Sequence, residues 1–223
     1  MSRVLFISVH PDDETLGCGG AILKHRLLGD DVFWLIMTNI NDEDKWGKVK
    51  ILERQKEIDS VAGRFGFAEV RKLNFDTMKL DGLPLDDLIQ GISQYVRKIL
   101  PTSIYVNNRS DVHSDHRVGF KATMSATKSF NNPFLQRILM YETLSETEFA
   151  PSLGENAFAP NFFVDISKFI AEKIDIMKIY RSELREHPFP RSEKNIRALA
   201  TFRGAQCGAE YAEGFVILKD IWR

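Results

Sequence analysis

Cysteine is scarce in this 223-residue sequence: only Cys18 and Cys207 are present, and they lie far apart in the chain. Two distant cysteines do not make a disulfide framework, and their scarcity suits a reducing compartment. Long apolar runs are also missing, because the longest one, residues 32–37, is far too short to span a bilayer. Asp12 and Asp13 would interrupt any signal-peptide core at the N-terminus. We therefore expect a cytoplasmic protein with no membrane partner.

Charge of one sign is not in excess either. The chain has 30 basic and 31 acidic residues, so it lacks the positive charge typical of nucleic-acid-binding proteins. There is no internal repeat or low-complexity segment. The G-x-G-x-x-G dinucleotide fingerprint is absent too, because Gly17, Gly19 and Gly20 have a different spacing and follow an acidic turn. We expect these glycines to allow close packing of a helix.

Hydrophobic residues make up 43% of the chain, which is enough for a full core and argues against disorder. The length predicts one domain over residues 1–223, with about 145–223 as a C-terminal extension that borders the functional site. Apolar runs that predict strands alternate with stretches of helical periodicity. This alternation predicts an α/β fold, Rossmann-like in class, with a mostly parallel sheet and helices on both faces. The expected strands are 4–9, 32–38, 70–73, 103–106, 138–141, 162–165 and 215–218. The expected helices are 21–28, 49–64, 85–100, 118–128, 167–184 and 193–201, the last continuing toward Cys207.

Polar side chains are concentrated just after the first expected strand. His10, Asp12, Asp13 and Glu14 lie on a tight strand-to-helix turn. In an open α/β sheet, that end of a strand is where ligands bind. Concentrating this much charge there does not stabilise a fold, whereas a bound metal ion would explain it.

A second polar turn follows the fourth expected strand and contains Asp111, His113, Asp115 and His116. If the sheet is parallel, both turns open on the same edge and converge, although a hundred residues separate them. Imidazole nitrogen and carboxylate oxygen are ligands that zinc favours. The competing interpretation is two ordinary helix N-termini with aspartate caps and satisfied histidines, and the pairing of the two turns argues against it.

The two turns together resemble a known family. His10-Pro11-Asp12-Asp13-Glu14 with Asp111-x-His113-x-Asp115-His116 is similar to the zinc-dependent de-N-acetylases of the PIG-L/LmbE-like family, which includes the N-acetylglucosaminyl-phosphatidylinositol, mycothiol-pathway and bacillithiol-pathway deacetylases. A weaker likeness extends to residues 187–192 and 203–204. The resemblance implies a Rossmann-like fold, bound Zn²⁺, hydrolysis of an N-acetyl group from a glucosamine-type sugar and assembly into a homo-oligomer.

The resemblance also implies a role for each motif residue. His10, Asp13 and His116 match the zinc ligands, and Asp12 matches the general base. His113 matches the histidine that stabilises the oxyanion or protonates the leaving amine. Asp115 matches the acid that holds this histidine in place. Chemistry agrees with these roles, because amide hydrolysis needs an activated water, a polarised carbonyl and a proton for nitrogen. A carboxylate such as Asp115 or Asp111 would raise the pKa of His113 and fix its ring.

Candidate substrate contacts lie outside the two motifs. Arg54 resembles the family's arginine that reaches sugar hydroxyls or a phosphate, and a surface ion pair with Glu53 or Glu57 is an equal alternative. Arg109, beside the second turn, could meet an anionic aglycone. Trp46 could be a sugar-stacking platform, a lid residue or a packing residue. Cys18 could touch a metal, but packing at the start of a helix is favoured.

The sequence thus predicts a zinc-dependent N-deacetylase acting on a small-molecule N-acetylated amino sugar or conjugate. Two alternatives remain open. A metal-dependent phosphoesterase would normally use more carboxylates for two metal ions. A non-catalytic sugar- or nucleotide-binding module would need neither the base Asp12 nor the acid His113. The sequence does not identify the aglycone.

Overall fold

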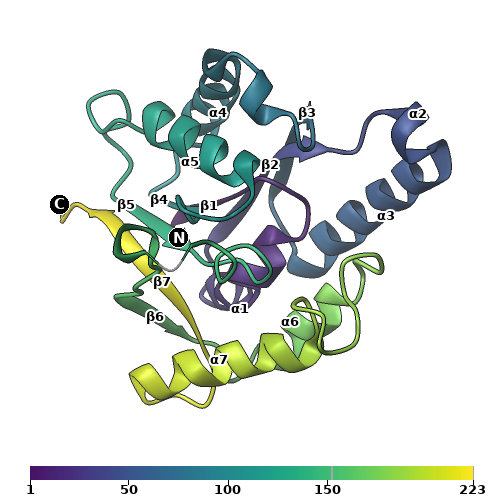
Figure 1. The fold of residues 1–223 in the computed structure, drawn as a ribbon. Helices are drawn as coiled ribbons and strands as arrows, with labels where there is room; N and C mark the ends of the chain where they lie inside the picture. The colour runs from purple at the N-terminus through teal and green to yellow at the C-terminus, as the bar shows by residue number, and fades with distance from the viewer. Residues whose placement is uncertain (152, 223) are drawn as a thin grey trace.

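A seven-stranded mixed sheet crosses the middle of the molecule, with helices on both faces (Figure 1). The computed structural model describes residues 1–151 and 153–222. The strands are β1 (Arg3–Ser8), β2 (Asp31–Asn39), β3 (Glu69–Asp76), β4 (Ser103–Asn107), β5 (Arg137–Tyr141), β6 (Phe162–Asp165) and β7 (Ala212–Asp220). The helices are α1 (Asp13–Leu27), α2 (Glu43–Trp46), α3 (Lys48–Phe65), α4 (Leu85–Ile99), α5 (Ser114–Ala126), α6 (Ile170–Met177) and α7 (Glu193–Cys207), with short 3₁₀ turns η1 (Leu80–Gly82) and η2 (Gly154–Asn156).

The strand order is β3-β2-β1-β4-β5-β7-β6. Strands β1 to β5 are parallel, and β7 runs antiparallel to both β5 and β6. The prediction of a mostly parallel α/β fold is therefore confirmed. The chain winds outward from β1 to β2 and β3 on one side, and continues from β4 on the other. This reversal between β1 and β4 creates the crevice where open α/β sheets bind ligands.

Alternate side chains of β1 enter the two cores that lie on opposite faces of the sheet. Val4 and Phe6 pack with α1, α3, α6 and α7, whereas Leu5 and Ile7 pack with α4 and α5. Figure 1 shows these two helical layers on either side of the sheet. Burial on both faces explains why the strand is an uninterrupted apolar run. Among the described residues, no helix combines the length and apolarity needed to cross a membrane.

The expected helix boundaries need several corrections. Helix α1 begins at Asp13 rather than at residue 21, so Asp13 and Glu14 of the first polar turn already lie in the helix. Helix α5 begins at Ser114 rather than at residue 118, so the second polar turn includes the first helical turn. The helix expected over 167–184 is shorter: α6 spans Ile170–Met177, and non-helical turns follow it up to residue 192. Apolar spacing continues beyond α6, because Ile179 and Tyr180 pack against the core without belonging to the helix. Periodicity alone does not separate such a packed loop from another helical turn.

The glycines in α1 allow the close approach expected from the sequence. A Cβ atom on Gly17 would lie 2.3 Å from the ring of Tyr141, and one on Gly20 would lie 2.3 Å from the side chain of Ile166. Cys18 is completely buried between them. It belongs to neither candidate group of metal ligands found among the described residues. This part of α1 is therefore built for packing against the sheet and the segment before α6.

A buried ion pair joins α1 to the C-terminal part of the chain. Lys173 Nζ in α6 lies 2.7 Å from a carboxylate oxygen of Glu213 in β7 and also donates to the Leu16 carbonyl at 2.8 Å. Glu213 accepts hydrogen bonds from the backbone N–H groups of Gly20 and Ala21, both at 2.8 Å. This ion pair thus connects α6 and β7 to α1, the helix that carries the first polar turn.

We expect Lys173→Met to destabilise the protein by about 3–5 kcal/mol, because Glu213 would remain buried without its counter-charge. Urea denaturation measures the change in the free energy of unfolding. Lys168→Met, at an exposed position just before α6, is the matched control and should change stability by less than about 0.5 kcal/mol. Equal stabilities of the two variants would mean that the buried pair contributes nothing net.

Candidate active site

The two polar turns meet beside β1 and β4, where the strand order of the sheet reverses. The first turn leaves the C-terminal end of β1, and the second leaves the C-terminal end of β4, which is the parallel neighbour of β1. Asn107 at the end of β4 joins them directly, because its side-chain oxygen accepts a hydrogen bond from the Val9 N–H at 3.2 Å. The structure therefore brings together the residues that the sequence predicted to converge.

Three donor atoms from these turns form a compact group. His10 Nδ1 lies 3.1 Å from His116 Nε2 and 3.9 Å from Asp13 Oδ2, and His116 Nε2 lies 3.4 Å from the same oxygen. Donors bound tetrahedrally to zinc at about 2.0–2.2 Å are separated by about 3.3–3.6 Å. The three separations lie within this range or on either side of it, so small side-chain adjustments bring His10, Asp13 and His116 to the three-protein-ligand pattern of a catalytic zinc site.

The outer nitrogens of both histidines are held by carboxylates. His116 Nδ1 lies 2.8 Å from Asp111 Oδ2, and His10 Nε2 lies 3.3 Å from Asp115 Oδ2. A carboxylate accepts, so each of these nitrogens carries its ring's proton. His10 Nδ1 and His116 Nε2 face each other across 3.1 Å. Burial alone would lower the pKa of His116, but the charge of Asp13 and the hydrogen bonds to Asp111 and Asp13 outweigh it and raise that pKa well above its usual range, so the ring can hold a second proton on Nε2. A metal ion bound to both nitrogens takes the place of that second proton, so the donor chemistry suits a metal ion.

Neighbouring charges set the protonation of this group. Burial alone would raise the pKa of Asp13, but the charges and hydrogen bonds of His116 and His10 outweigh it and lower that pKa. Asp13 also accepts the backbone N–H groups of Val9 and His10 at 3.1 and 2.8 Å. It is therefore held as a carboxylate, which is the form that binds metal.

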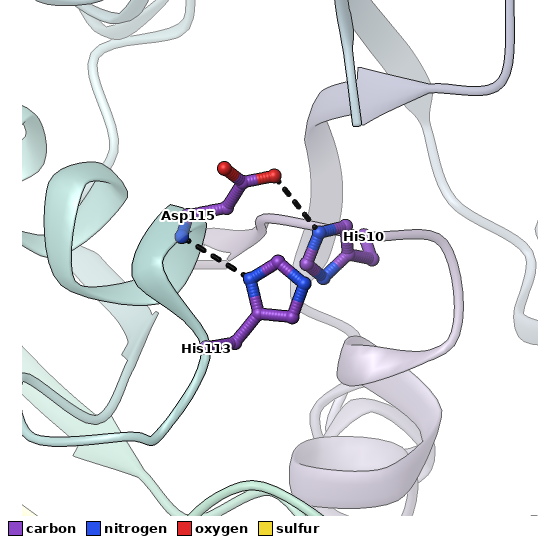
Figure 2. A group of neighbouring side chains, drawn as sticks. All are labelled: His10, His113 and Asp115. Atoms are coloured by element: carbon purple, nitrogen blue, oxygen red, sulfur yellow. Dashed lines mark hydrogen bonds and ion pairs between the residues drawn. The ribbon is translucent and has the colours of Figure 1, made fainter. Parts of the chain in front are cut away.

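The role implied for Asp115 needs a correction. Its carboxylate contacts the ring of His10, not that of His113, as Figure 2 shows. His113 is the N-cap of α5, so its Nδ1 accepts the backbone N–H of Asp115 at 3.1 Å. The Asp115 side chain instead accepts the N–H groups of Met78 and Leu80 at 2.6 and 3.0 Å. Asp115 holds His113 only through its backbone, because α5 begins earlier than the sequence suggested.

The expected rise in the pKa of His113 is also wrong. Burial and the nearby rings of His10 and His116 lower the pKa of His113 to about 4, and the charge of Asp115 only partly offsets this. The ring is accordingly neutral at pH 7. Because Nδ1 is an acceptor, the proton lies on Nε2. His113 can therefore donate one hydrogen bond from Nε2.

Asp12 has a strained backbone and a buried side chain. Its φ angle is 126°, a region that residues other than glycine rarely adopt and that costs on the order of 1–3 kcal/mol. Glu14, itself fully buried, holds this conformation by accepting the Asp12 N–H at 3.0 Å. Burial, the charge of Asp13 and the charge of Glu183 raise the pKa of Asp12 well above its usual range. Asp12 is not in the three-donor group beside it.

A cavity of about 420 Å³ opens over these residues. His10, Asp12, Asp13 and His113 line one part of it. The rest of the lining comes from the end of β2, from α2 and the start of α3, from the loops after β3 and β5, and from the turns after α6. These other lining residues include Trp46, Lys50, Arg54, Glu146, Ser182, Glu183 and Arg191. The C-terminal part of the chain therefore borders the site.

The two arginines predicted to contact substrate are placed differently. Arg54 lines the cavity, but it is buried and donates to the Pro11 carbonyl, to Ser182 and to Glu183. It also lies 3.4 Å from Glu57, so the ion-pair alternative is right about this partner and wrong about the surface location. Arg109 donates to the Glu155 carbonyl and does not line this cavity, which leaves its predicted contact with substrate without support.

Sequence reasoning missed several charged residues of the cavity wall, among them Arg191, Glu146 and Glu183. Arg191 lies 3.7 Å from Asp12 and 3.1 Å from Glu183, and its buried Nε atom has no hydrogen-bond partner. Burial raises the pKa of Glu146 to about 7. Arg191 lies in the 187–192 segment that was noted for its resemblance, so that likeness was a usable signal. No local pattern marks Glu146 or Glu183, because the loops that carry them have no periodicity.

Replacing Asp115 tests its contact with His10. We expect Asp115→Asn to weaken zinc binding about 10–100-fold, because the carboxylate that orients the ring is lost. A zinc competition titration with a chromophoric chelator measures this. Asp81→Asn, at an exposed position in η1, is the matched control and should bind zinc as the wild type does. Unchanged affinity in the Asp115 variant would show that His10 needs no such support.

Comparison with known proteins agrees with this geometry. A family model described as PIG-L, GlcNAc-PI de-N-acetylase, matches residues 5–127, which is more than half of the chain and includes both polar turns. The chain belongs to the PIG-L family. The family predicted from the sequence is thereby confirmed, and the protein is an enzyme of the deacetylase type.

Individual relatives cover the whole length of this PIG-L protein. The diacetylchitobiose deacetylase of Thermococcus kodakarensis is 26% identical over 234 residues, covering 100% of this chain and 85% of the relative. The structure of the Pyrococcus horikoshii N,N′-diacetylchitobiose deacetylase superimposes with a TM-score of 0.77 at 24% identity, covering 98% of this chain and 84% of that one. A 4-carboxy-2-hydroxymuconate hydratase from Pseudomonas putida KT2440 has the same fold, with a TM-score of 0.76, 16% identity, and coverage of 100% and 98%. The fold alone therefore does not decide the reaction.

Proposed function

We propose that this protein is a zinc-dependent N-deacetylase that removes the acetyl group from an N-acetylglucosamine-type sugar or conjugate. One observation carries the proposal: the donor atoms of His10, Asp13 and His116 form one compact group, and His10 and Asp13 line a cavity together with Asp12 and His113. The diacetylchitobiose deacetylase relative supports the choice of an amino sugar. The ligand set, the roles and the metal are part of the proposal.

The side chains suit each step of amide hydrolysis. Zinc, when bound by His10, Asp13 and His116, supplies a Lewis acid that polarises the carbonyl and acidifies water. Asp12 takes the proton from the attacking water. A raised pKa makes its carboxylate a stronger base than an ordinary aspartate, which suits a general base. His113 donates its Nε2 proton in a hydrogen bond to the developing oxyanion. The proton on Asp12 can then pass to the leaving nitrogen, so that acetate and a free amine are formed.

For His113, the structure favours one of the two roles left open by the sequence. A neutral ring with pKa about 4 is a poor source of a proton for the leaving amine, but it is a good hydrogen-bond donor. We therefore assign His113 to the oxyanion and the amine proton to Asp12.

A phosphoesterase with two metal ions is less well supported. The second candidate ligand group among the described residues, His10, His113 and Asp115, shares His10 with the first. In addition, Nδ1 of His113 and the carboxylate of Asp115 already bond to backbone N–H groups. The described donor atoms therefore suit one metal ion rather than two.

Acetate release tests the function directly. We expect zinc-loaded protein to release acetate and free amine in equal amounts from N-acetylglucosamine or N,N′-diacetylchitobiose, and we expect a chelator to abolish turnover. Re-addition of zinc should restore it. Enzymatic assay of acetate together with fluorescent detection of the amine measures both products. The proposal would be refuted if no N-acetylated sugar released acetate, whichever divalent metal ion was added.

A further inference from the structure

The peptide bond between Pro11 and Asp12 is held in a strained orientation. Asp13 donates its backbone N–H to the His10 carbonyl at 3.4 Å, so residues 10–13 form a β-turn. Asp12 is the third residue of this turn, and its positive φ is typical of a type II turn, which normally requires glycine or asparagine there. Flipping the Pro11–Asp12 peptide would give a type I turn, in which the third residue has a φ of about −90°. An unstrained alternative is therefore one peptide flip away.

Two buried charged side chains oppose that flip. Arg54 donates to the Pro11 carbonyl at 3.3 Å, and Glu14 accepts the Asp12 N–H at 3.0 Å. These two polar groups belong to the same peptide unit, so we call Arg54 and Glu14 the peptide clamp. A flip would break both hydrogen bonds in a buried environment, where an unpaired polar group is costly.

Tyr180 contacts both members of the peptide clamp. It lies in the turns after α6 and is completely buried. Its hydroxyl donates to Glu14 Oε1 at 3.0 Å, while the Arg54 guanidinium carbon lies 5.6 Å from the centre of its ring. Because Glu14 uses its other oxygen, Oε2, for the Asp12 N–H, one carboxylate links the Tyr180 hydroxyl to the strained peptide. A single side chain thus supports the clamp on both sides.

Packing alone does not call for this hydroxyl, because a phenylalanine ring would fill the same space. Glu14 Oε1 also accepts from the Thr15 hydroxyl at 2.6 Å, but Thr15 is its neighbour on α1 and moves with it. Tyr180 is 166 residues away in the chain. It is therefore the donor that fixes the Glu14 carboxylate relative to the rest of the fold.

We propose that Tyr180 is a positioning residue for the general base: through the peptide clamp it keeps the Pro11–Asp12 peptide in its strained orientation and so directs the Asp12 carboxylate at the attacking water. The inference rests on the proposed function, in which Asp12 is the base. Tyr180 itself is not among the residues that line the active-site cavity. Strained backbone persists only where the surrounding structure enforces it, and the clamp supplies that enforcement.

Tyr180→Phe removes only the hydroxyl. We expect kcat to fall about tenfold or more with KM and zinc content unchanged, because a shift of about 1 Å in a reacting group can cost 10²-fold in rate. Tyr105→Phe is the matched control: Tyr105 is also buried, and its hydroxyl lies 3.1 Å from His25 at the far end of α1. It should keep the wild-type kcat.

Two kinetic outcomes would overturn the proposal. One is a wild-type kcat in Tyr180→Phe. The other is a rise in KM alone, which would mean that Tyr180 shapes the wall of the cavity rather than the base.

Amide hydrogen exchange observes the peptide itself and needs no substrate. The Asp12 N–H is buried and hydrogen-bonded, so it should exchange slowly in the wild type. We expect exchange to be about tenfold faster or more in Tyr180→Phe and unchanged in Tyr105→Phe, as measured by NMR on isotopically labelled protein. Equal rates in the wild type and Tyr180→Phe would overturn the proposal.

A double variant tests the route through Glu14. Glu14→Gln keeps the size of the side chain, but its single oxygen cannot replace the two carboxylate oxygens that accept from Asp12 and Tyr180. We expect Tyr180→Phe/Glu14→Gln to have the kcat of Glu14→Gln alone, because both changes release the same peptide. Two losses that multiply in the double variant would overturn this route.

Failure of the deacetylase function is distinguishable from failure of this inference. If no N-acetylated sugar releases acetate, the proposed function fails. The exchange rate of the Asp12 amide then decides the inference by itself. Faster exchange in Tyr180→Phe supports Tyr180 as the residue that holds the peptide, and equal rates overturn it.

Discussion

Asp12→Asn should lower kcat about 10²–10⁴-fold and leave the zinc content unchanged. An amide cannot accept the proton of the attacking water, and general-base catalysis contributes about that factor. Asp12 is not one of the three grouped donor atoms, so metal binding does not need it. Asparagine has the same shape as aspartate and keeps the backbone N–H that Glu14 accepts, so the strained backbone at this position is supported as before. Steady-state kinetics and elemental analysis of the same preparation measure both quantities.

The matched control is Asp81→Asn, an exposed substitution that removes the same charge away from the cavity. It should have wild-type kcat and zinc content. If Asp12→Asn turned over at the wild-type rate, Asp12 would not be the base. If it lost zinc as well, its role would be in binding the metal.

His116→Ala should lose both zinc and activity. His116 is completely buried, and its Nε2 lies within 3.4 Å of the other two grouped donor atoms. Removing a direct ligand should weaken zinc binding by more than the roughly 10–100-fold expected for an orienting partner. Since a ligand that binds only the folded state raises Tm, zinc should stabilise the wild type and not the variant. Calorimetric melting with and without zinc measures this difference.

His25→Ala is a suitable control for that experiment. His25 is a half-buried histidine that contacts Asp30 and Tyr105, at the far end of α1 from the site. Its loss should cost some stability but keep the shift in Tm with zinc. A normal zinc-induced shift in His116→Ala would mean that the metal binds elsewhere.

Two features of the sequence were enough to predict the metal-site turns. They are the local alternation of strands and helices and the rule that the carboxyl ends of parallel strands lie at one edge of the sheet. His10 and Asp13 follow β1, and His116 follows β4, so the shared sheet edge places them together. The prediction needed only the alternation of strands and helices, which is strong where both faces of a strand are buried. For the same reason the order of elements was right over most of the chain.

The errors in the site arose where the direction of a side chain depends on the residue at which a helix begins. Asp115 turns toward His10 and the η1 loop because α5 begins at Ser114, and no pattern distinguished that start from one four residues later. Arg191, Glu183 and Glu146 reach the cavity from irregular segments whose path is set by long-range packing. Sequence periodicity does not report on such segments.

The chemistry and the surroundings of this site come from separate stretches of chain. The proposed hydrolytic residues lie on the turns after β1 and β4, whereas much of the outer wall comes from residues 38–54 and 182–191. Natural variation can therefore alter the wall while the hydrolytic turns are inherited unchanged. Such a division makes new specificities evolutionarily accessible in small steps. For protein engineering, libraries confined to the wall would sample new substrates without exposing the hydrolytic residues to mutation.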